Sequence, residues 1–288
     1  MAAHGVPLPD FVSTPTLEAA IKAGRDFGYP FILKNRRMAY DGRGNAVVEK
    51  EEDIRAAFEK LAPGVAPDQG VQFDVYAERW VPFIKELAIM VVRTATGVVN
   101  YPVVETVQND NICHLVMAPA QLPCASFNDA VDVAKLAIGS FDGIGIYGVE
   151  MFLLQDGSIY LNEIAPRPHN SGHYTMDACD IDQFEMHLRA VLGLPCPTPT
   201  MRVGAALMIN ILGEKTMSET MIVLNRALEV PGCGIHWYGK GESRVARKMA
   251  HLTITANDVP TLATRFRQLG TVHELSPDFM NLLPAPES

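Results

Sequence analysis

The feature that most constrains the fold is the Asp156-Gly157 pair, which lies between two segments of strand-forming residues. Residues 147–154 and 158–164 are rich in β-branched, aromatic and other apolar side chains, as expected for the two strands of a hairpin. Asp-Gly is a common two-residue hairpin turn, and such a turn fixes the register of its strands. In that register Glu150 lies directly opposite Glu163.

Two carboxylates that face each other across a strand pair repel, because their Cβ atoms lie only about 5 Å apart. A divalent cation would offset this repulsion. Magnesium binds one or two protein carboxylates together with substrate phosphates, so the pair fits a metal–nucleotide complex better than an all-protein metal cage. The alternative is a longer turn, which would shift the register and leave one glutamate solvated.

Two stretches rich in proline and glycine divide the chain, one from Pro63 to Gly70 and one from Pro195 to Pro199. We therefore expect three subdomains, at residues 1–70, 71–197 and 198–288. Helical and strand patterns are mixed along the chain, which predicts an α+β fold with a β-rich C-terminal subdomain.

The first subdomain is predicted to begin with a helix that Thr14 caps, with Pro15 in its first position and Gly28 at its end. Ser126 is predicted to cap a later helix that runs to about residue 140. The other predicted strands are 31–34, 46–48, 71–79, 84–93, 98–104, 205–212, 234–237 and 252–255. The other predicted helices are 51–61, 184–191, 218–228 and 259–269.

The composition is that of a globular protein, with 48% hydrophobic and 20% charged residues. A net charge of −9 argues against a protein that follows a nucleic-acid backbone, because phosphate neutralisation requires a basic surface. The five cysteines lack the paired spacing of a zinc site or a disulfide framework, which favours a reducing compartment. Neither a leader nor an apolar run of about 20 residues is apparent, so we expect a cytosolic protein that does not enter a membrane.

Lys34 follows three apolar residues and would end a buried strand, where a phosphate in a cleft could satisfy its ammonium. The alternative is a strand-end lysine that reaches water. The next segment, residues 39–45, carries Tyr40, Asp41 and Arg43 beside glycines. It would form either a loop whose backbone N–H groups approach an anion or an ordinary hairpin turn.

Two further segments suit anions. Prolines flank Arg167 and restrict its backbone, which suits a guanidinium aimed at a planar oxyanion, and His169 and Asn170 would add neutral donors. Lys240 and Arg247 belong to a basic cluster in an acidic chain and would bind a phosphate monoester. The alternatives are a rigid surface loop for the first segment and a solvated hairpin for the second.

Together these segments resemble the ATP-grasp core of the carboxyaminoimidazole ribonucleotide synthases, in particular the fungal form within bifunctional aminoimidazole ribonucleotide carboxylases. The resemblance runs from about residue 5 to residue 255. It is carried by Phe-Gly-Tyr-Pro-Phe-Ile-Leu-Lys (27–34), Ala-Tyr-Asp-Gly-Arg-Gly-Asn (39–45), Tyr-Gly-Val-Glu-Met-Phe (147–152) and the block from 162 to 173. It implies an ATP-grasp fold, in which two α+β subdomains clasp ATP and the smaller one acts as a lid.

The resemblance also implies a role for each candidate residue. Magnesium would bind Glu150, Glu163 and Asn162, although strict alternation places Asn162 on the opposite face unless a bulge or a strand end intervenes. ATP would bind Lys34 through its phosphates, and its adenine and ribose would be held by Glu78, Trp80, Val81 and Glu86. Bicarbonate would bind Arg167, His169 and Asn170. The aminoimidazole ribonucleotide would bind Tyr40, Asp41, Arg43, Lys240 and Arg247.

The implied activity is the ATP-dependent carboxylation of aminoimidazole ribonucleotide with bicarbonate in purine biosynthesis. The alternatives are another ATP-grasp ligase that joins a carboxylate to an amine, and a non-catalytic nucleotide-binding protein. Family members have a further N-terminal domain, and the fungal proteins have a second catalytic domain whose activity we do not expect here. Dimers are common in the family. Ala246 and Ala250 stand where the family usually has glycine, and a methyl group would distort a phosphate loop that needs positive φ.

Overall fold

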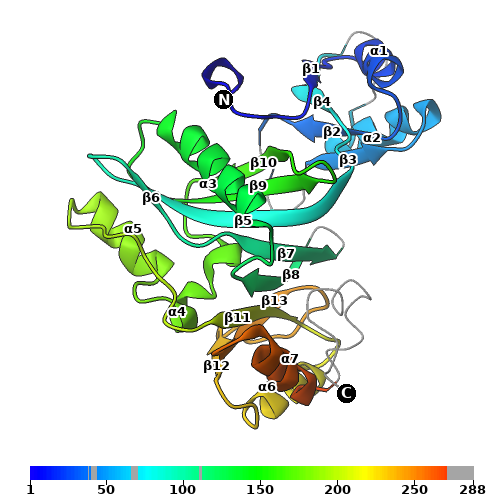
Figure 1. Ribbon diagram of the computed structural model, residues 1–288. Coiled ribbons are helices and arrows are strands. Elements are labelled where there is room, and N and C mark those ends of the chain that lie inside the picture. Colours follow the sequence, from blue (N-terminus) through cyan, green and yellow to red (C-terminus); the bar gives the residue numbers. More distant parts are fainter. Residues whose placement is uncertain (38, 40–43, 66–70, 110–111, 271–288) are drawn as a thin grey trace. The chain divides into compact units, whose positions relative to one another are not determined.

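The computed structural model describes residues 1–37, 39, 44–65, 71–109 and 112–270, and these form two compact units (Figure 1). One unit is Pro7–Phe83, and the other comprises Met1–Val6 and the chain from Ile84 onward. The first unit extends beyond the boundary expected at residue 70, because the strand after that boundary pairs within its sheet. The three subdomains stay a prediction.

In its described residues, the first unit consists of an antiparallel sheet and two α-helices. Its strands are β1 (Phe11–Ser13), β2 (Phe31–Asn35), β3 (Asn45–Val48) and β4 (Val75–Arg79), in the order β1-β4-β2-β3. Its helices are α1 (Leu17–Phe27) and α2 (Ile54–Leu61), the latter preceded by a 3₁₀ turn at Glu51–Asp53.

Helix α1 begins after Thr16, whose side chain accepts a hydrogen bond from the Ala19 N–H, so the predicted cap at Thr14 is wrong. The reason is that the Thr14 N–H donates to the Val75 carbonyl at 3.1 Å, which keeps the chain extended there. Gly28, at φ 82°, ends the helix as predicted.

The core of this unit lies between the helices and one face of the sheet. Phe31 and Leu33 of β2 are fully buried there and pack in one cluster with Phe58 of α2. Because side chains alternate along a strand, Lys34 lies on the opposite face of the sheet from this core.

The second unit contains a nine-stranded sheet in the order β10-β9-β5-β7-β8-β11-β13-β12, with β6 paired to β5. Each of its described strand registers is antiparallel. The strands are β5 (Phe83–Arg93), β6 (Val98–Asn100), β7 (Val104–Asn109), β8 (Ile112–Ala118), β9 (Gly145–Leu154), β10 (Ile159–Ala165), β11 (Ala205–Leu212), β12 (Cys233–Trp237) and β13 (Lys248–Ala256).

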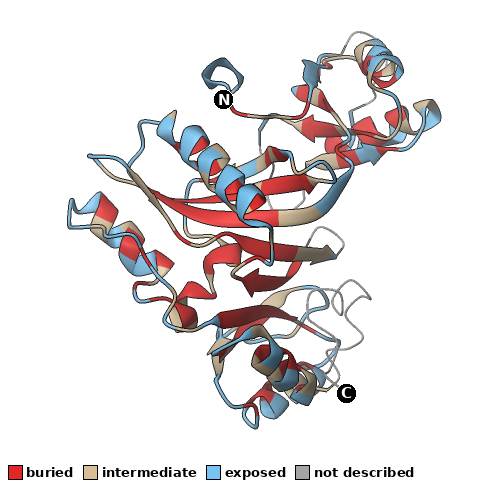
Figure 2. Ribbon diagram, viewed as in Figure 1, coloured by how far each residue is buried: buried red, intermediate tan, exposed pale blue. Residues whose placement is uncertain are grey.

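Helices cover both faces of this sheet, and their inward sides are buried (Figure 2). Helices α6 (Met217–Ala227) and α7 (Val259–Gln268) share one core cluster with β11 and β13. Helices α4 (Thr175–Ala178) and α5 (Gln183–Val191) share another with β5, β8 and β11. Helix α3 (Cys124–Gly139) contacts β6, β9 and β10.

Three details differ from the predictions for this unit. The segment 98–104 forms two strands, because the chain leaves the ladder between Asn100 and Val104, and β8 was not predicted at all. Helix α3 begins at Cys124 after Pro123, so Ser126 lies buried in its first turn and does not cap it. In the described part of the chain, no helix has the length and apolar character that a membrane crossing requires.

Candidate active site

The hairpin of β9 and β10 has a longer turn than the sequence predicts. Leu154 N–H donates to the Ser158 carbonyl at 2.9 Å, and Gly157, at φ 88°, donates to the Leu154 carbonyl at 3.0 Å. Three residues therefore form the turn. Next to it the register differs by one residue from the predicted one, and Met151 pairs with Leu161.

A β-bulge at Asn162 corrects this shift. The register changes between Leu161 and Glu163, and Glu163 then pairs with Glu150. The predicted pair of facing carboxylates is thus confirmed, although the turn from which it was derived is wrong. The bulge required at Asn162 is also confirmed, and it sets Asn162 and Glu163 together against Glu150.

A third carboxylate, Glu86 of β5, adds to the charge of this pair. Burial, with the nearby charges of Glu163 and Glu86 as smaller causes, raises the pKa of Glu150 to about 7. Burial also raises the pKa of Glu86 to about 7. Strands β10, β9 and β5 are neighbours, so the site concentrates negative charge on adjacent strands. Such a donor set fits a hard divalent cation such as magnesium, which would keep the carboxylates ionised.

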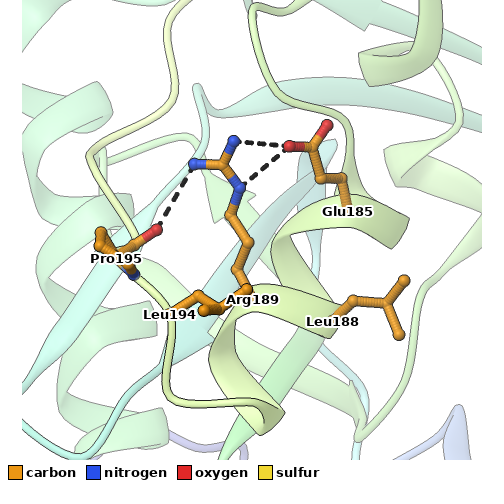
Figure 3. Close-up of a pocket in the computed structure, with 5 residues that line it drawn as sticks. All are labelled: Glu185, Leu188, Arg189, Leu194 and Pro195. Carbon is orange, nitrogen blue, oxygen red and sulfur yellow. Dashed lines mark hydrogen bonds and ion pairs between the residues drawn. The ribbon is translucent and has the colours of Figure 1, made fainter.

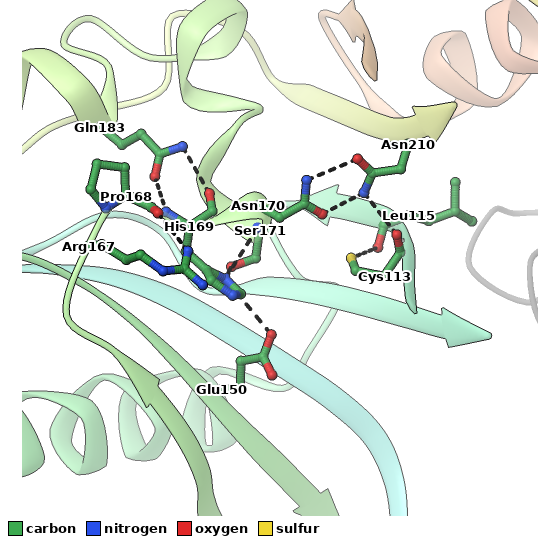
Figure 4. A network of polar contacts seen from close by, with 10 residues as sticks. All are labelled: Cys113, Leu115, Glu150, Arg167, Pro168, His169, Asn170, Ser171, Gln183 and Asn210. Carbon is green, nitrogen blue, oxygen red and sulfur yellow. Dashed lines mark hydrogen bonds and ion pairs between the residues drawn. The ribbon is translucent and has the colours of Figure 1, made fainter. Parts of the chain in front are cut away.

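The segment from Arg167 to Ser171 lies near Glu150 (Figure 4). His169 Nδ1 is 3.9 Å from Glu150 Oε1. The backbone of His169 is fixed by one side chain, because its N–H donates to Gln183 Oε1 and its carbonyl accepts from Gln183 Nε2, each at 2.9 Å. Gly148 of β9 makes this approach possible, since a Cβ there would lie 2.5 Å from the His169 Cβ.

Asn170 is held by Asn210 of β11, a residue that the sequence analysis missed (Figure 4). Asn170 Nδ2 donates to Asn210 Oδ1 at 2.9 Å, and Asn210 Nδ2 donates to Asn170 Oδ1 at 2.5 Å and to the Cys113 carbonyl at 2.8 Å. The signal was an amide, only 2% exposed, in the middle of an otherwise apolar strand.

Arg167 is exposed, and its Nη1 donates to the Pro168 carbonyl at 3.1 Å. Its positive charge lowers the pKa of Glu150, but burial and the charge of Glu163 have larger effects and raise it. His169 therefore lies near Glu150, and the charge of Arg167 acts on the same carboxylate, whereas Asn170 is hydrogen-bonded to Asn210. The exposure of Arg167 agrees with the alternative of a surface arginine, whereas His169 and Asn170 are partly buried, and the role of the segment stays a prediction.

The basic cluster brings Lys240 and Arg247 near each other. Partial burial lowers the pKa of Lys240, and the charges of Arg247 and Lys248 lower it further. The Lys240 ammonium donates to the Lys248 carbonyl, and it lies 5.4 Å from the centre of the Tyr238 ring. Lys248, which the sequence analysis did not select, also lowers the pKa of Glu150, so this cluster acts electrostatically on the carboxylate site.

Ala246 and Ala250, the two positions at which the resemblance implies glycine, have different backbones. Ala246 adopts φ 64°, so the predicted need for positive φ is confirmed at that position. For Ala250 the prediction is wrong, because this residue lies within β13, where it pairs with Ile211 and Trp237 and has the extended backbone of a strand.

In the first unit, Lys34 forms an ion pair with Glu78, with 2.7 Å between Nζ and Oε1. Both residues are buried, so the alternative of a lysine that reaches water is wrong. Trp80 is 37% exposed, whereas Val81 is buried. Tyr40, Asp41 and Arg43 lie outside the described residues.

A surface cavity of about 400 Å³ lies away from the predicted residues, beside α5 (Figure 3). Glu185, Leu188, Arg189, Leu194 and Pro195 line it. Arg189 bridges it with an ion pair to Glu185 at 2.6 Å and a contact to the Pro195 carbonyl at 3.4 Å. None of the residues predicted for the site is among these five.

Comparison with known protein families gives two matches. Residues 1–184 match the ATP-grasp domain, and residues 206–265 match the phosphoribosylaminoimidazole carboxylase C-terminal domain. The fold agrees with the first match, and the chain belongs to the ATP-grasp family. Within that family it groups with the carboxyaminoimidazole ribonucleotide synthases, as the following similarities show.

The chain is 48% identical over 270 residues to the phosphoribosylaminoimidazole carboxylase of Schizosaccharomyces pombe, which covers 92% of this chain and 47% of that protein. It is 36% identical to the N5-carboxyaminoimidazole ribonucleotide synthase of Synechococcus elongatus, over 87% of this chain and 61% of that protein. The chain thus spans about half the length of the curated relatives that it matches.

Solved structures give the same grouping. Carboxyaminoimidazole ribonucleotide synthase from Aspergillus clavatus, complexed with ATP, superposes with a TM-score of 0.85 at 42% identity. The match covers 95% of this chain and 70% of that one. A second structure from the same organism, complexed with ADP and aminoimidazole ribonucleotide, has the same TM-score at 40% identity and the same coverage.

Proposed function

We propose that this chain carries the site for ATP-dependent carboxylation of aminoimidazole ribonucleotide. The γ-phosphoryl group of ATP passes to bicarbonate and gives ADP and carboxyphosphate. Carboxyphosphate then breaks down to phosphate and carbon dioxide, which joins the exocyclic amine to give the carbamate. The observation that carries this proposal is the pair of Glu150 and Glu163 beside His169, on a chain similar to synthases that bind ATP and the ribonucleotide.

Glu150, Glu163 and Asn162 would hold magnesium, which when bound neutralises the phosphate charge that develops during transfer. The supporting evidence is electrostatic. A carboxylate whose pKa lies near 7 is only partly ionised at neutral pH, and a bound cation favours the ionised form that ligates it. The bulge supplies an amide oxygen next to the two carboxylates.

Arg167, His169 and Asn170 would bind bicarbonate. Their support is rigidity, because Gln183 fixes the backbone of His169 and Asn210 fixes the amide of Asn170. Donors that are already oriented need no rearrangement when negative charge develops on the anion, so they stabilise it at little cost in free energy. Positioning and charge stabilisation of this kind are the usual ways in which proteins assist phosphoryl transfer.

ATP would bind Lys34, and Lys34 would exchange part of its bond to Glu78 for the phosphates. The adenine and ribose would be held by Glu78, Trp80, Val81 and Glu86. Lys240 and Arg247 would hold the ribonucleotide phosphate, since two nearby cations suit a dianion. Tyr40, Asp41 and Arg43 are proposed for the same substrate. The proposal includes a cytosolic location and a homodimeric assembly.

The test is ADP release by this chain with ATP, magnesium and bicarbonate, measured with and without aminoimidazole ribonucleotide. We expect release that requires all four. Stimulation by other amines with bicarbonate omitted would establish a different ATP-grasp ligase. ATP binding by calorimetry without turnover would refute the catalytic proposal and favour a nucleotide-binding protein.

A further inference from the structure

Three side chains of metal-ligating type meet at a place that the proposed function does not use. They are Asp177 of α4, His236 of β12 and His251 of β13. One potential ligand atom from each lies within 4.8 Å of the others. The two histidines are direct partners in the β12–β13 register, and the carboxylate reaches them from the helix.

His251 has an unused nitrogen in the interior. The residue is 2% exposed, and its Nδ1 lies 2.8 Å from the Tyr238 hydroxyl. Its Nε2 is buried and has no hydrogen-bond partner among the described residues. When Nδ1–H donates to Tyr238, Nε2 carries a lone pair, and a buried lone pair without a partner costs free energy.

Asp177 is held tightly against the strands. Its Oδ2 lies 2.8 Å from His236 Nε2, and a Cβ on Gly234 would come within 2.4 Å of its Oδ1. Only a glycine at position 234 therefore allows the carboxylate to approach β12 this closely. Burial lowers the pKa of His251 to about 3, so this ring is neutral and offers a lone pair beside the Asp177 carboxylate.

We propose that Asp177, His236 and His251 form a binding site for a transition-metal ion of borderline softness, such as Zn²⁺ or Co²⁺. Two imidazoles and one carboxylate are a common ligand set for zinc, whereas magnesium prefers oxygen ligands. The hydroxyl of Tyr238 would orient His251 from behind, as partners of metal-bound histidines usually do. Water would complete a tetrahedral ion.

The geometry requires a modest closure on binding. Metal bonds of about 2.0–2.1 Å in a tetrahedron separate the ligand atoms by about 3.4 Å, so the widest pair would approach by at most about 1.4 Å. The rings of His236 and His251 now stack with 4.4 Å between their centres and 11° between their planes, so lone pairs that lie in these two planes do not converge on one ion. One ring must therefore turn about χ2, a torsion with a broad preference in histidine.

The ion would join α4 to the β12–β13 hairpin and so stabilise the neighbouring block. His173 stacks on His251 with 4.7 Å between ring centres, and it also contacts Gln183, which fixes His169. The site would therefore stiffen the segment that presents His169 and Asn170 without contacting a substrate itself.

The experiment uses the full chain, freed of metal by chelation and then titrated with Co²⁺ and Zn²⁺ in the presence of millimolar Mg²⁺. We expect one equivalent of Co²⁺ to give the intense visible absorption of a tetrahedral complex, and Zn²⁺ to displace it. The thermal midpoint should rise with Zn²⁺. His251→Gln and Asp177→Asn should each abolish the absorption, whereas His4→Gln, in an exposed turn, should not change it.

Failure to observe tetrahedral Co²⁺, or the same absorption in all three variants, would overturn the proposal. Circular dichroism on each metal-free variant shows whether it is folded. If His251→Gln unfolds, Asp177→Asn decides the question, because it keeps the volume and loses only a charged ligand. Failure of ATP turnover would not affect this result, since neither readout depends on activity.

Discussion

Replacing Ala246 with glycine should stabilise the protein, because Ala246 holds a left-handed backbone at φ 64°. A Cβ in that region costs about 1–2 kcal/mol through contact with the backbone carbonyl. Glycine removes this contact but makes the unfolded chain more flexible, which costs about 0.4–1 kcal/mol. The expected net gain in the free energy of unfolding is about 0.5–1 kcal/mol, or a rise of about 2 °C in the thermal midpoint.

The same exchange at Ala250 is the matched control. Ala250 is fully buried in the middle of the paired strand β13, so glycine there loses a buried methyl group and gains only flexibility. We expect a loss of about 1–2 kcal/mol. Thermal unfolding of both variants, followed by circular dichroism, tests the pair. A destabilised Ala246→Gly would refute the assignment of strain to the backbone at that position.

Three other changes probe the carboxylate site. Glu163→Gln should abolish magnesium-dependent ATP turnover and leave the circular dichroism spectrum unchanged, and full activity would disprove the metal assignment. Gly148→Ala should cost about 1–3 kcal/mol and lower turnover at least about tenfold, because the new Cβ meets His169, whereas Gly139→Ala, with open space, should be neutral in both assays. Native Glu150 keeps its proton up to about pH 7, whereas the unfolded carboxyl keeps it only to about pH 4.5, so the free energy of unfolding should fall as pH rises between these values. The expected fall is about 1–3 kcal/mol, and it should be smaller in Glu150→Gln. Urea unfolding at several pH values tests this, and equal pH dependence in the two proteins would contradict it.

Local patterns were sufficient to predict much of the fold. Helix α1, strand β2 and the β9–β10 hairpin were identified from residue spacing and from the glycines that end them. Their boundaries moved where a distant residue intervened. Thr14 has the chemistry of a helix cap, but its N–H is taken by Val75, some 60 positions later in the chain, and sequence spacing contains no information about that bond.

Sequence patterns predicted the proximity of those candidate site residues that lie close together along the chain. Glu150, Glu163 and the His169–Asn170 pair come from a single stretch of the chain. Asn210 and Asp177 were missed because their partners lie on other elements, and only the strand order brings these together. Lys34 was predicted beside a phosphate, whereas the ion pair with Glu78 depends on the pairing of β2 with β4.

The bulge at Asn162 shifts the pairing of β10 with β9 by one residue. Before it, odd-numbered residues of β10 such as Leu161 pair with odd-numbered residues of β9; after it, Glu163 pairs with an even-numbered one. Deleting Asn162 would therefore leave Glu163 as the neighbour of Leu161 and still opposite Glu150. The residue can be regarded as an insertion that adds an amide to the strand without separating the two carboxylates that pair across it.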